Sequence, residues 1–164
     1  VCPSKKTSVG AWIAIAVAVT ISVLTSFGAF AQDRLSVARQ GDSEGRTVVF
    51  VPGLATPGSV FEPYAAQRVD LDAHLVTIAG FGGLPALDPA DGVIRPAAQA
   101  LAAYLDEQAL DDVVLVGHSL GAQVALVTAG QATERVAHVV VVDSLPFFQG
   151  MINPDADPAM VRAQ

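Results

Sequence analysis

Five residues near the middle of the chain have the types and spacing of a nucleophilic serine site. The pentapeptide Gly117-His118-Ser119-Leu120-Gly121 follows the apolar run 113–116 and precedes a helix-like stretch, 122–129. This G-x-S-x-G pattern carries chemical meaning when it lies between a strand and a helix. A serine on so tight a turn projects its hydroxyl beyond the sheet edge, and Gly117 and Gly121 are needed because a Cβ would collide with neighbouring elements. The pattern predicts Ser119 as a nucleophile.

The runs around this motif predict an α/β architecture. The sequence favours strands at 47–51, 74–78, 113–116 and 136–142, a polar turn at 40–46, and a short edge strand at Leu35 and Val37. Helices are expected at 59–67, 93–108 and 122–130. The main strand runs are uniformly apolar, which is typical of parallel strands covered on both faces. The alternation predicts a doubly wound, mostly parallel α/β sheet.

Three loops should then meet at one edge of that sheet. Pro52-Gly53-Leu54 follows the first apolar strand, the serine turn follows 113–116, and Asp143 follows 136–142. Open α/β sheets form their sites outside the carboxyl ends of their strands. We therefore expect these three loops to surround the site.

On these motifs the chain resembles the α/β-hydrolase superfamily over residues 47–148. The resemblance implies that Ser119 is the nucleophile and that the backbone N–H groups of Leu54 and Leu120 form the oxyanion hole. Many members have His-Gly where this chain has Pro52-Gly53, so an ordinary strand-ending turn is the alternative for that loop. Apolar residues near the mouth would bind an apolar acyl or alcohol group: Leu54, Phe81, Phe147 and Phe148.

The general base and the acid are less well specified than the nucleophile. The histidines His74, His118 and His138 are interpreted as packing or surface residues, and the superfamily places its catalytic histidine late in the chain. The resemblance therefore implies a base beyond residue 164. Asp143 is the candidate triad acid, and its alternative role is to end the strand or shape the mouth of the site. No metal-ligand spacing or phosphate-binding loop is found in the sequence, so no cofactor is expected.

The first 31 residues have the pattern of a secretory signal peptide. Lys5 and Lys6 precede a mostly apolar run from 9 to 24, and Ala29-Phe30-Ala31 forms a small-x-small cleavage site. The sequence predicts a protein exported to the periplasm or secreted, with a membrane anchor formed by residues 9–30 as the alternative. Beyond residue 31, seven arginines face sixteen carboxylates, a net charge of −9. This charge argues against nucleic acid and anionic membrane surfaces as partners.

The predicted organisation is a signal peptide at 1–31, the N-terminal part of an α/β-hydrolase core at 32–148, and the start of a cap at 149–164. The core would be truncated before its last strands, and residues 1–164 alone are expected to be inactive. Val1 is compatible with a fragment or with a GUG start codon. The leading hypothesis is an exported serine hydrolase that cleaves an ester, thioester or amide of a small molecule through an acyl-enzyme on Ser119. The alternatives are an acyltransferase or cofactor-free haloperoxidase on the same fold, and a non-catalytic binding or scaffold member.

Overall fold

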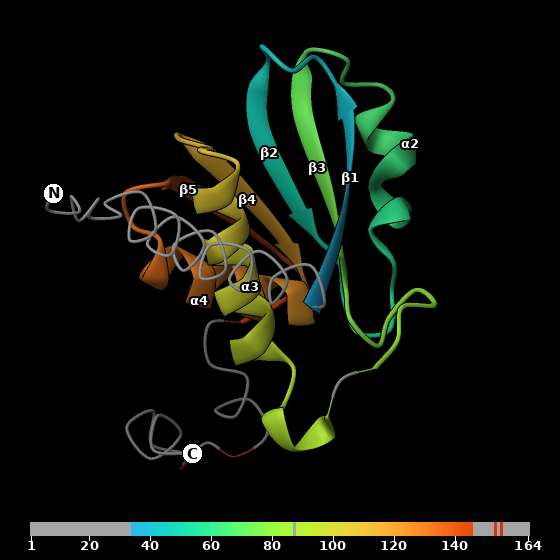
Figure 1. The fold of residues 1–164 in the computed structure, drawn as a ribbon, viewed down its shortest axis with the longest axis vertical. Helices are drawn as coiled ribbons and strands as arrows, with labels where there is room; N and C mark the ends of the chain where they lie inside the picture. Colours follow the sequence, from blue (N-terminus) through green and yellow to red (C-terminus); the bar gives the residue numbers. More distant parts are fainter. Residues whose placement is uncertain (1–33, 87, 146–152, 154, 156–164) are drawn as a thin grey trace, which may run out of the picture.

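A five-stranded, mostly parallel sheet forms the centre of the computed structural model, which describes residues 34–86, 88–145, 153 and 155 (Figure 1). The strands lie in the order β1-β3-β2-β4-β5. They are β1 (Leu35–Gly41), β2 (Arg46–Val51), β3 (Leu71–Ile78), β4 (Val113–His118) and β5 (Val136–Val142). Only β1 is antiparallel to its neighbour, β3. The predicted mostly parallel α/β sheet is confirmed.

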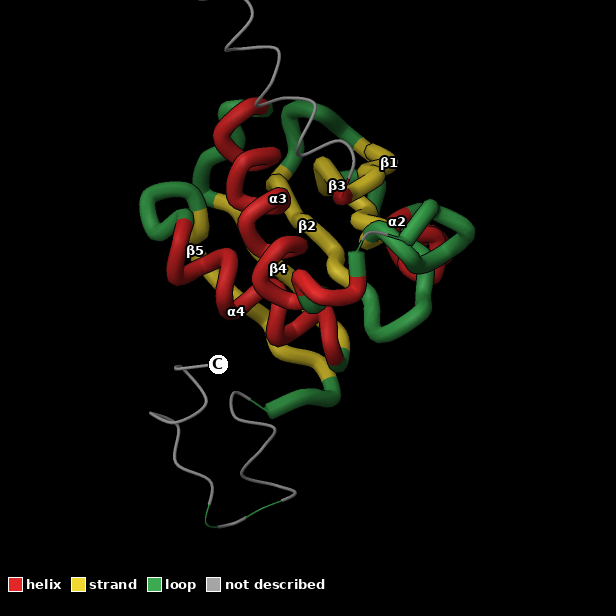
Figure 2. Tube along the Cα trace, turned by 60° about the horizontal axis from the view of Figure 1, so that its bottom comes forward, coloured by secondary structure: helices red, strands yellow, loops and turns green. Residues whose placement is uncertain are grey.

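Helices cover both faces of this sheet. They are α2 (Glu62–Ala65), α3 (Ile94–Glu107) and α4 (Leu120–Gln131), with the 3-10 helices η1 (Gly58–Phe61) and η2 (Pro89–Asp91). Figure 2 shows α3 and α4 on one face and α2 apart from them on the other side of β3. Each face of the sheet has its own hydrophobic core. The core between the sheet and helices α3 and α4 includes Val49, Val51, Leu101, Leu105, Leu115 and Val124. The core on the face covered by α2 includes Val48, Phe50, Ala65 and Leu75.

Several elements differ from their predicted form. Strand β1, expected as a short edge strand at Leu35 and Val37, extends to Gly41 and enters the polar turn expected at 40–46. Strand β3 begins at Leu71 instead of residue 74, and Asp72 is buried within it, paired with Arg39 of β1 and His74 of β3. The helix expected at 59–67 is divided into η1 and α2, and Pro63, which has no N–H to donate, stands in the first turn of α2. Strand β5 has the expected bounds, but most of its side chains are exposed within the described part of the chain.

The strand order places a topological switch point at the end of β2. Strand β3 joins β2 on one side and β4 joins it on the other, so the loops that leave β2 and β4 diverge toward opposite faces. Val51 at the end of β2 is paired with Gly117 of β4. The Pro52-Gly53 turn therefore lies beside the serine turn, at the kind of switch point where α/β sheets bind ligands.

Several expectations fall outside the described residues. These are the signal peptide at 1–31, the anchor alternative at 9–30, the pocket residues Phe147 and Phe148, and most of the expected cap. Among the residues that are described, no helix combines the length and the hydropathy needed to cross a bilayer.

Candidate active site

Ser119 has the backbone conformation of a strained turn between β4 and α4. Its φ of 52° and ψ of −118° lie outside the regions that L-residues favour, a conformation that costs about 1–3 kcal/mol. Serine in this position normally caps the helix with its side chain, yet Ser119 makes no side-chain cap hydrogen bond. Its hydroxyl is therefore not used to hold the helix end.

Two glycines allow this turn to pack against the sheet. A Cβ added to Gly121 would lie 2.1 Å from the carbonyl oxygen of Val51 and 2.4 Å from that of Pro52. A Cβ on Gly117 would lie 2.4 Å from the Cα of Ala122. Both contacts involve backbone atoms that cannot rotate away, so a side chain at either position would separate the turn from β2 or from its own helix.

The loop after β2 brings backbone donors beside the serine. A Cβ added to Gly53 would lie 3.4 Å from the Cβ of Ser119 and 3.0 Å from Nδ1 of His118, so the two loops are in contact. Leu54 follows Gly53 directly, and Leu120 is the first residue of α4. Among the described residues, neither N–H donates a hydrogen bond to another group. The amino terminus of α4 also provides a partial positive charge that favours an anion at this position.

Asp143 lies at the same edge, directly after β5. The N–H of Ser119 donates to the carbonyl oxygen of Val142 at 2.9 Å, which brings the end of β5 against the serine turn. The Oδ2 atom of Asp143 lies 4.0 Å from Nε2 of His118, and its side chain is 90% exposed. His118 thus lies between the Gly53 loop and Asp143.

Backbone strain is concentrated at this edge of the sheet. Five non-glycine residues in the described part of the chain have positive φ: Ala55, Ala109, Asp112, Ser119 and Asp143. Three of them follow β2, β4 and β5, and the other two lie in the connection between α3 and β4. Such conformations persist only where the surrounding structure fixes them, and they cluster at functional sites.

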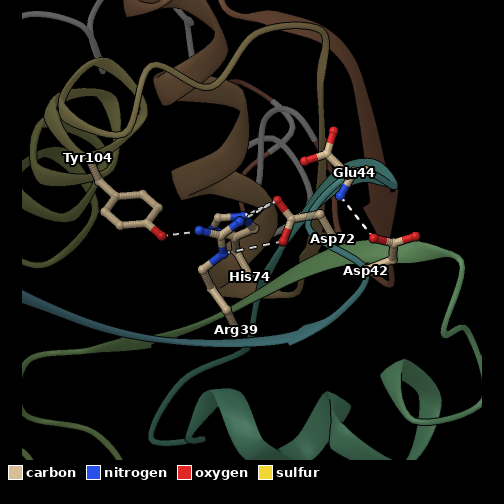
Figure 3. Close-up of polar contacts among 6 residues, drawn as sticks. All are labelled: Arg39, Asp42, Glu44, Asp72, His74 and Tyr104. Atoms are coloured by element: carbon tan, nitrogen blue, oxygen red, sulfur yellow. Dashed lines mark hydrogen bonds and ion pairs between the residues drawn. The ribbon is translucent and has the colours of Figure 1, made fainter.

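A separate polar cluster lies between β1, β3 and α3 (Figure 3). His74 is fully buried and paired with Arg39 across the strands. Its Nε2 lies 3.0 Å from Oδ2 of Asp72, and its Nδ1 lies 2.7 Å from the hydroxyl of Tyr104. Nη2 of Arg39 donates to the same carboxylate oxygen at 2.8 Å. With Asp72 ionised, Nε2 donates to the carboxylate and Nδ1 accepts the proton of the tyrosine hydroxyl.

Burial shifts the pKa of two residues in this cluster, His74 and Tyr104. It lowers the pKa of His74, an effect that the neighbouring Asp72 opposes, and it raises the pKa of Tyr104. Both ring nitrogens of His74 are occupied by these partners, so His74 is not available to Ser119. His138 is an exposed residue in the first half of β5, away from the carboxyl edge.

The sequence did not predict this cluster, although it contained a partial signal. Asp72 and His74 are two residues apart in a strand and therefore share a face. Their partners, however, come from sequence positions about thirty residues away on either side. Sequence reasoning also overlooked Gln123, which donates from Nε2 to Ser144 Oγ at 3.2 Å and to the carbonyl oxygen of Leu145.

An apolar cavity of about 220 Å³ lies at the carboxyl end of β3. Phe81, one of the expected pocket residues, lines it together with Ile78 and Val93, but Ser119 does not line it, so the cavity is separate from the expected substrate pocket. Leu54 is instead 65% exposed. No group of three or more histidine, cysteine or carboxylate side chains with the geometry of a metal site occurs among the described residues.

Comparison with known proteins places this geometry in context. The model of the alpha/beta hydrolase family matches residues 48–164. The lipase LipV of Mycobacterium tuberculosis is 30% identical over 141 residues, which cover 79% of this chain and 53% of LipV. The chain thus spans about half the length of this relative.

Solved structures share the fold. An esterase from a marine microorganism superposes with a TM-score of 0.61 at 20% identity, covering 77% of this chain and 53% of the esterase. The N-acyl homoserine lactonase AidH, solved in complex with N-butanoyl homoserine, gives a TM-score of 0.65 at 18% identity and covers 79% of this chain and 49% of its own. At these identities the likeness concerns the fold alone.

Proposed function

Because the chain belongs to the α/β hydrolase family, we propose that it is part of an exported serine hydrolase that forms an acyl-enzyme on Ser119. The observation that carries the proposal is the strained turn between β4 and α4, whose serine makes no capping bond. The similarity to the lipase LipV supports a substrate that carries an acyl group. The substrate class is an ester, thioester or amide of a small molecule with an apolar acyl or alcohol part.

The proposed chemistry begins with attack of Ser119 Oγ on the substrate carbonyl carbon. A histidine general base accepts the hydroxyl proton, and the carbonyl oxygen becomes an oxyanion. Collapse of this intermediate expels the alcohol, thiol or amine, which takes up the proton, and leaves the acyl group on Ser119. Water then attacks the acyl-enzyme in the same way and releases the carboxylic acid.

The backbone N–H groups of Leu54 and Leu120 are assigned to the oxyanion. The contact between Gly53 and Ser119 supports this assignment, because it brings the loop after β2 within reach of the nucleophile. The partial positive charge at the start of α4 also stabilises an oxyanion at this position. Loss of one such donor typically lowers kcat by about 100- to 1000-fold.

Asp143 is the candidate acid, and none of the three histidines is assigned as the base. Asp143 follows β5 at the same edge of the sheet as Ser119, which supports a role next to the base. His74 is engaged by Asp72 and Tyr104. The family resemblance places the catalytic histidine late in the chain, and on that ground we propose that the base comes from a part of the complete protein beyond residue 164.

Hydrolysis of p-nitrophenyl esters by the product of the complete reading frame tests this function. We expect a pre-steady-state burst of p-nitrophenol with an amplitude close to one per protein molecule, and an acyl mass increment on the peptide that contains Ser119. Ser119→Ala should abolish both signals. Absence of turnover and of acylation across ester, thioester and amide substrates would favour the non-catalytic alternative.

Export is a separate part of the proposal with its own test. It rests on the two lysines, the apolar run and the small-x-small site of residues 5–31. Fractionation of the producing cells, followed by N-terminal sequencing, should give a protein outside the cytoplasm that begins at Gln32. A membrane-bound protein that retains residues 9–30 would support the anchor alternative instead.

A further inference from the structure

The first turn of α4 and the exit of β5 are joined by contacts on both sides of Asp143. Before Asp143, the N–H of Ser119 donates to the carbonyl oxygen of Val142 at 2.9 Å. After it, the side-chain amide of Gln123 donates to Ser144 Oγ at 3.2 Å and to the carbonyl oxygen of Leu145. The segment 143–145 is therefore held against the helix that carries the nucleophile.

These contacts stabilise the strained backbone conformation of Asp143. Its φ of 49° is left-handed, and its side chain is 90% exposed, so its own side-chain packing does little to fix the backbone. A strained residue of this kind persists only when its flanks are fixed. The backbone bond from Ser119 fixes one flank, and Gln123 is the side chain that fixes the other.

The position of Gln123 couples this segment to the nucleophile. Gln123 lies in the first turn of α4, four residues after Ser119, which is the N-cap of the helix. The acceptor at Leu145 is a backbone carbonyl, so a side chain at this position must carry a donor to hold it. Both the length and the amide of glutamine meet this requirement.

We propose that Gln123 is a positioning residue that holds the segment 143–145 as one wall of the substrate site beside Ser119. This inference rests on the proposed function and extends it, because it names the segment that determines which acyl groups the enzyme prefers. Gln123 touches neither the hydroxyl of Ser119 nor the assigned oxyanion donors, so its loss alters the wall and leaves the nucleophile in place.

The substitution Gln123→Met removes the donor and keeps the length of the side chain. Gln131→Met makes the same change at an exposed position at the end of α4 and serves as the matched control. Gln123→Lys retains a donor and tests rescue. In the complete protein, amide hydrogen exchange of the peptide covering 143–145 is measured for each variant, together with kcat and KM for p-nitrophenyl acetate and p-nitrophenyl octanoate.

For Gln123→Met we expect faster exchange at 143–145 and a roughly tenfold change in the ratio of octanoate to acetate kcat/KM. We also expect a lower kcat on both esters, because Asp143, the candidate acid, belongs to this segment. Gln123→Lys should restore most of these properties, and Gln131→Met should resemble the wild type. Exchange equal to that of the control would overturn the positioning role. Faster exchange with an unchanged ratio, or an equal loss on both esters, would overturn the assignment of the segment as a substrate wall. If the wild type forms no acyl-enzyme, the proposed function fails, and the exchange measurement still decides the role of Gln123.

Discussion

Replacement of Gly121 by alanine tests whether the serine turn depends on its close approach to β2. The added Cβ would lie 2.1 Å from the carbonyl oxygen of Val51, whereas a Cβ essentially never approaches another atom closer than 3.0 Å. The start of α4 and the end of β2 must therefore move apart by at least 0.9 Å, the difference between these distances. A second clash, with the carbonyl oxygen of Pro52 at 2.4 Å, prevents relief by a simple rotation.

Gly130 provides a matched control on the same helix. A Cβ added there meets no atom within 4 Å, so alanine should stabilise the protein by about 0.5–1 kcal/mol through its better helix propensity. Overpacking at Gly121 should cost about 1–3 kcal/mol. The two variants should thus differ in unfolding free energy by about 1.5–4 kcal/mol, which is measured from urea unfolding of the complete protein at a common m-value.

The same displacement should impair catalysis. A shift of about 1 Å in a reacting group can lower the rate about 100-fold, so Gly121→Ala should react with a fluorophosphonate about 100 times more slowly than the wild type. Gly130→Ala should react at the wild-type rate. The reasoning would be refuted if Gly121→Ala matched Gly130→Ala in both unfolding free energy and labelling rate.

Further predictions concern the buried cluster around His74. Tyr104→Phe should lower the unfolding free energy by about 1–3 kcal/mol, because it leaves a buried ring nitrogen without its 2.7 Å partner; a urea midpoint equal to that of the wild type would contradict this. Because burial lowers the pKa of His74 in the folded protein, the unfolded protein binds the proton first as the pH falls, so stability should decrease below about pH 6.5 and level off only below the lowered pKa. Unfolding measured between pH 7 and 5.5 should show a slope of up to about 1.4 kcal/mol per pH unit from this group. The slope should be absent in His74→Gln, and an equal slope in both proteins would assign it to other groups.

The sequence predicted the elements that depend on local patterns. Strand β5 has the expected bounds, and α3 differs from its expected range by one residue at each end. Both patterns, a continuous apolar run and a helical periodicity, depend only on residues that are close together in the sequence. The order of the motifs Gly53, Ser119 and Asp143 was sufficient to predict that their loops meet at one edge. Parallel strands place their carboxyl ends together whatever the detailed register.

The remaining features depend on contacts between distant residues. Asp72 lay outside every predicted element, and its partner Arg39 lies 33 residues earlier in the chain, so no local pattern indicated its buried position. The strain at Asp143 and the bonds from Gln123 to Ser144 and Leu145 arise from the packing of β5 against α4. No local pattern distinguishes Gln123 from a solvent-exposed helix residue.

Labelling of the complete protein with a fluorophosphonate, followed by mapping of the modified peptide by mass spectrometry, tests the central claim most directly. We expect one phosphonyl group per molecule, attached to Ser119, with no labelling of Ser119→Ala or of the denatured protein. A protein that stays unlabelled while a control serine hydrolase reacts fully, or that is labelled at another residue, would contradict the assignment of Ser119 as the nucleophile.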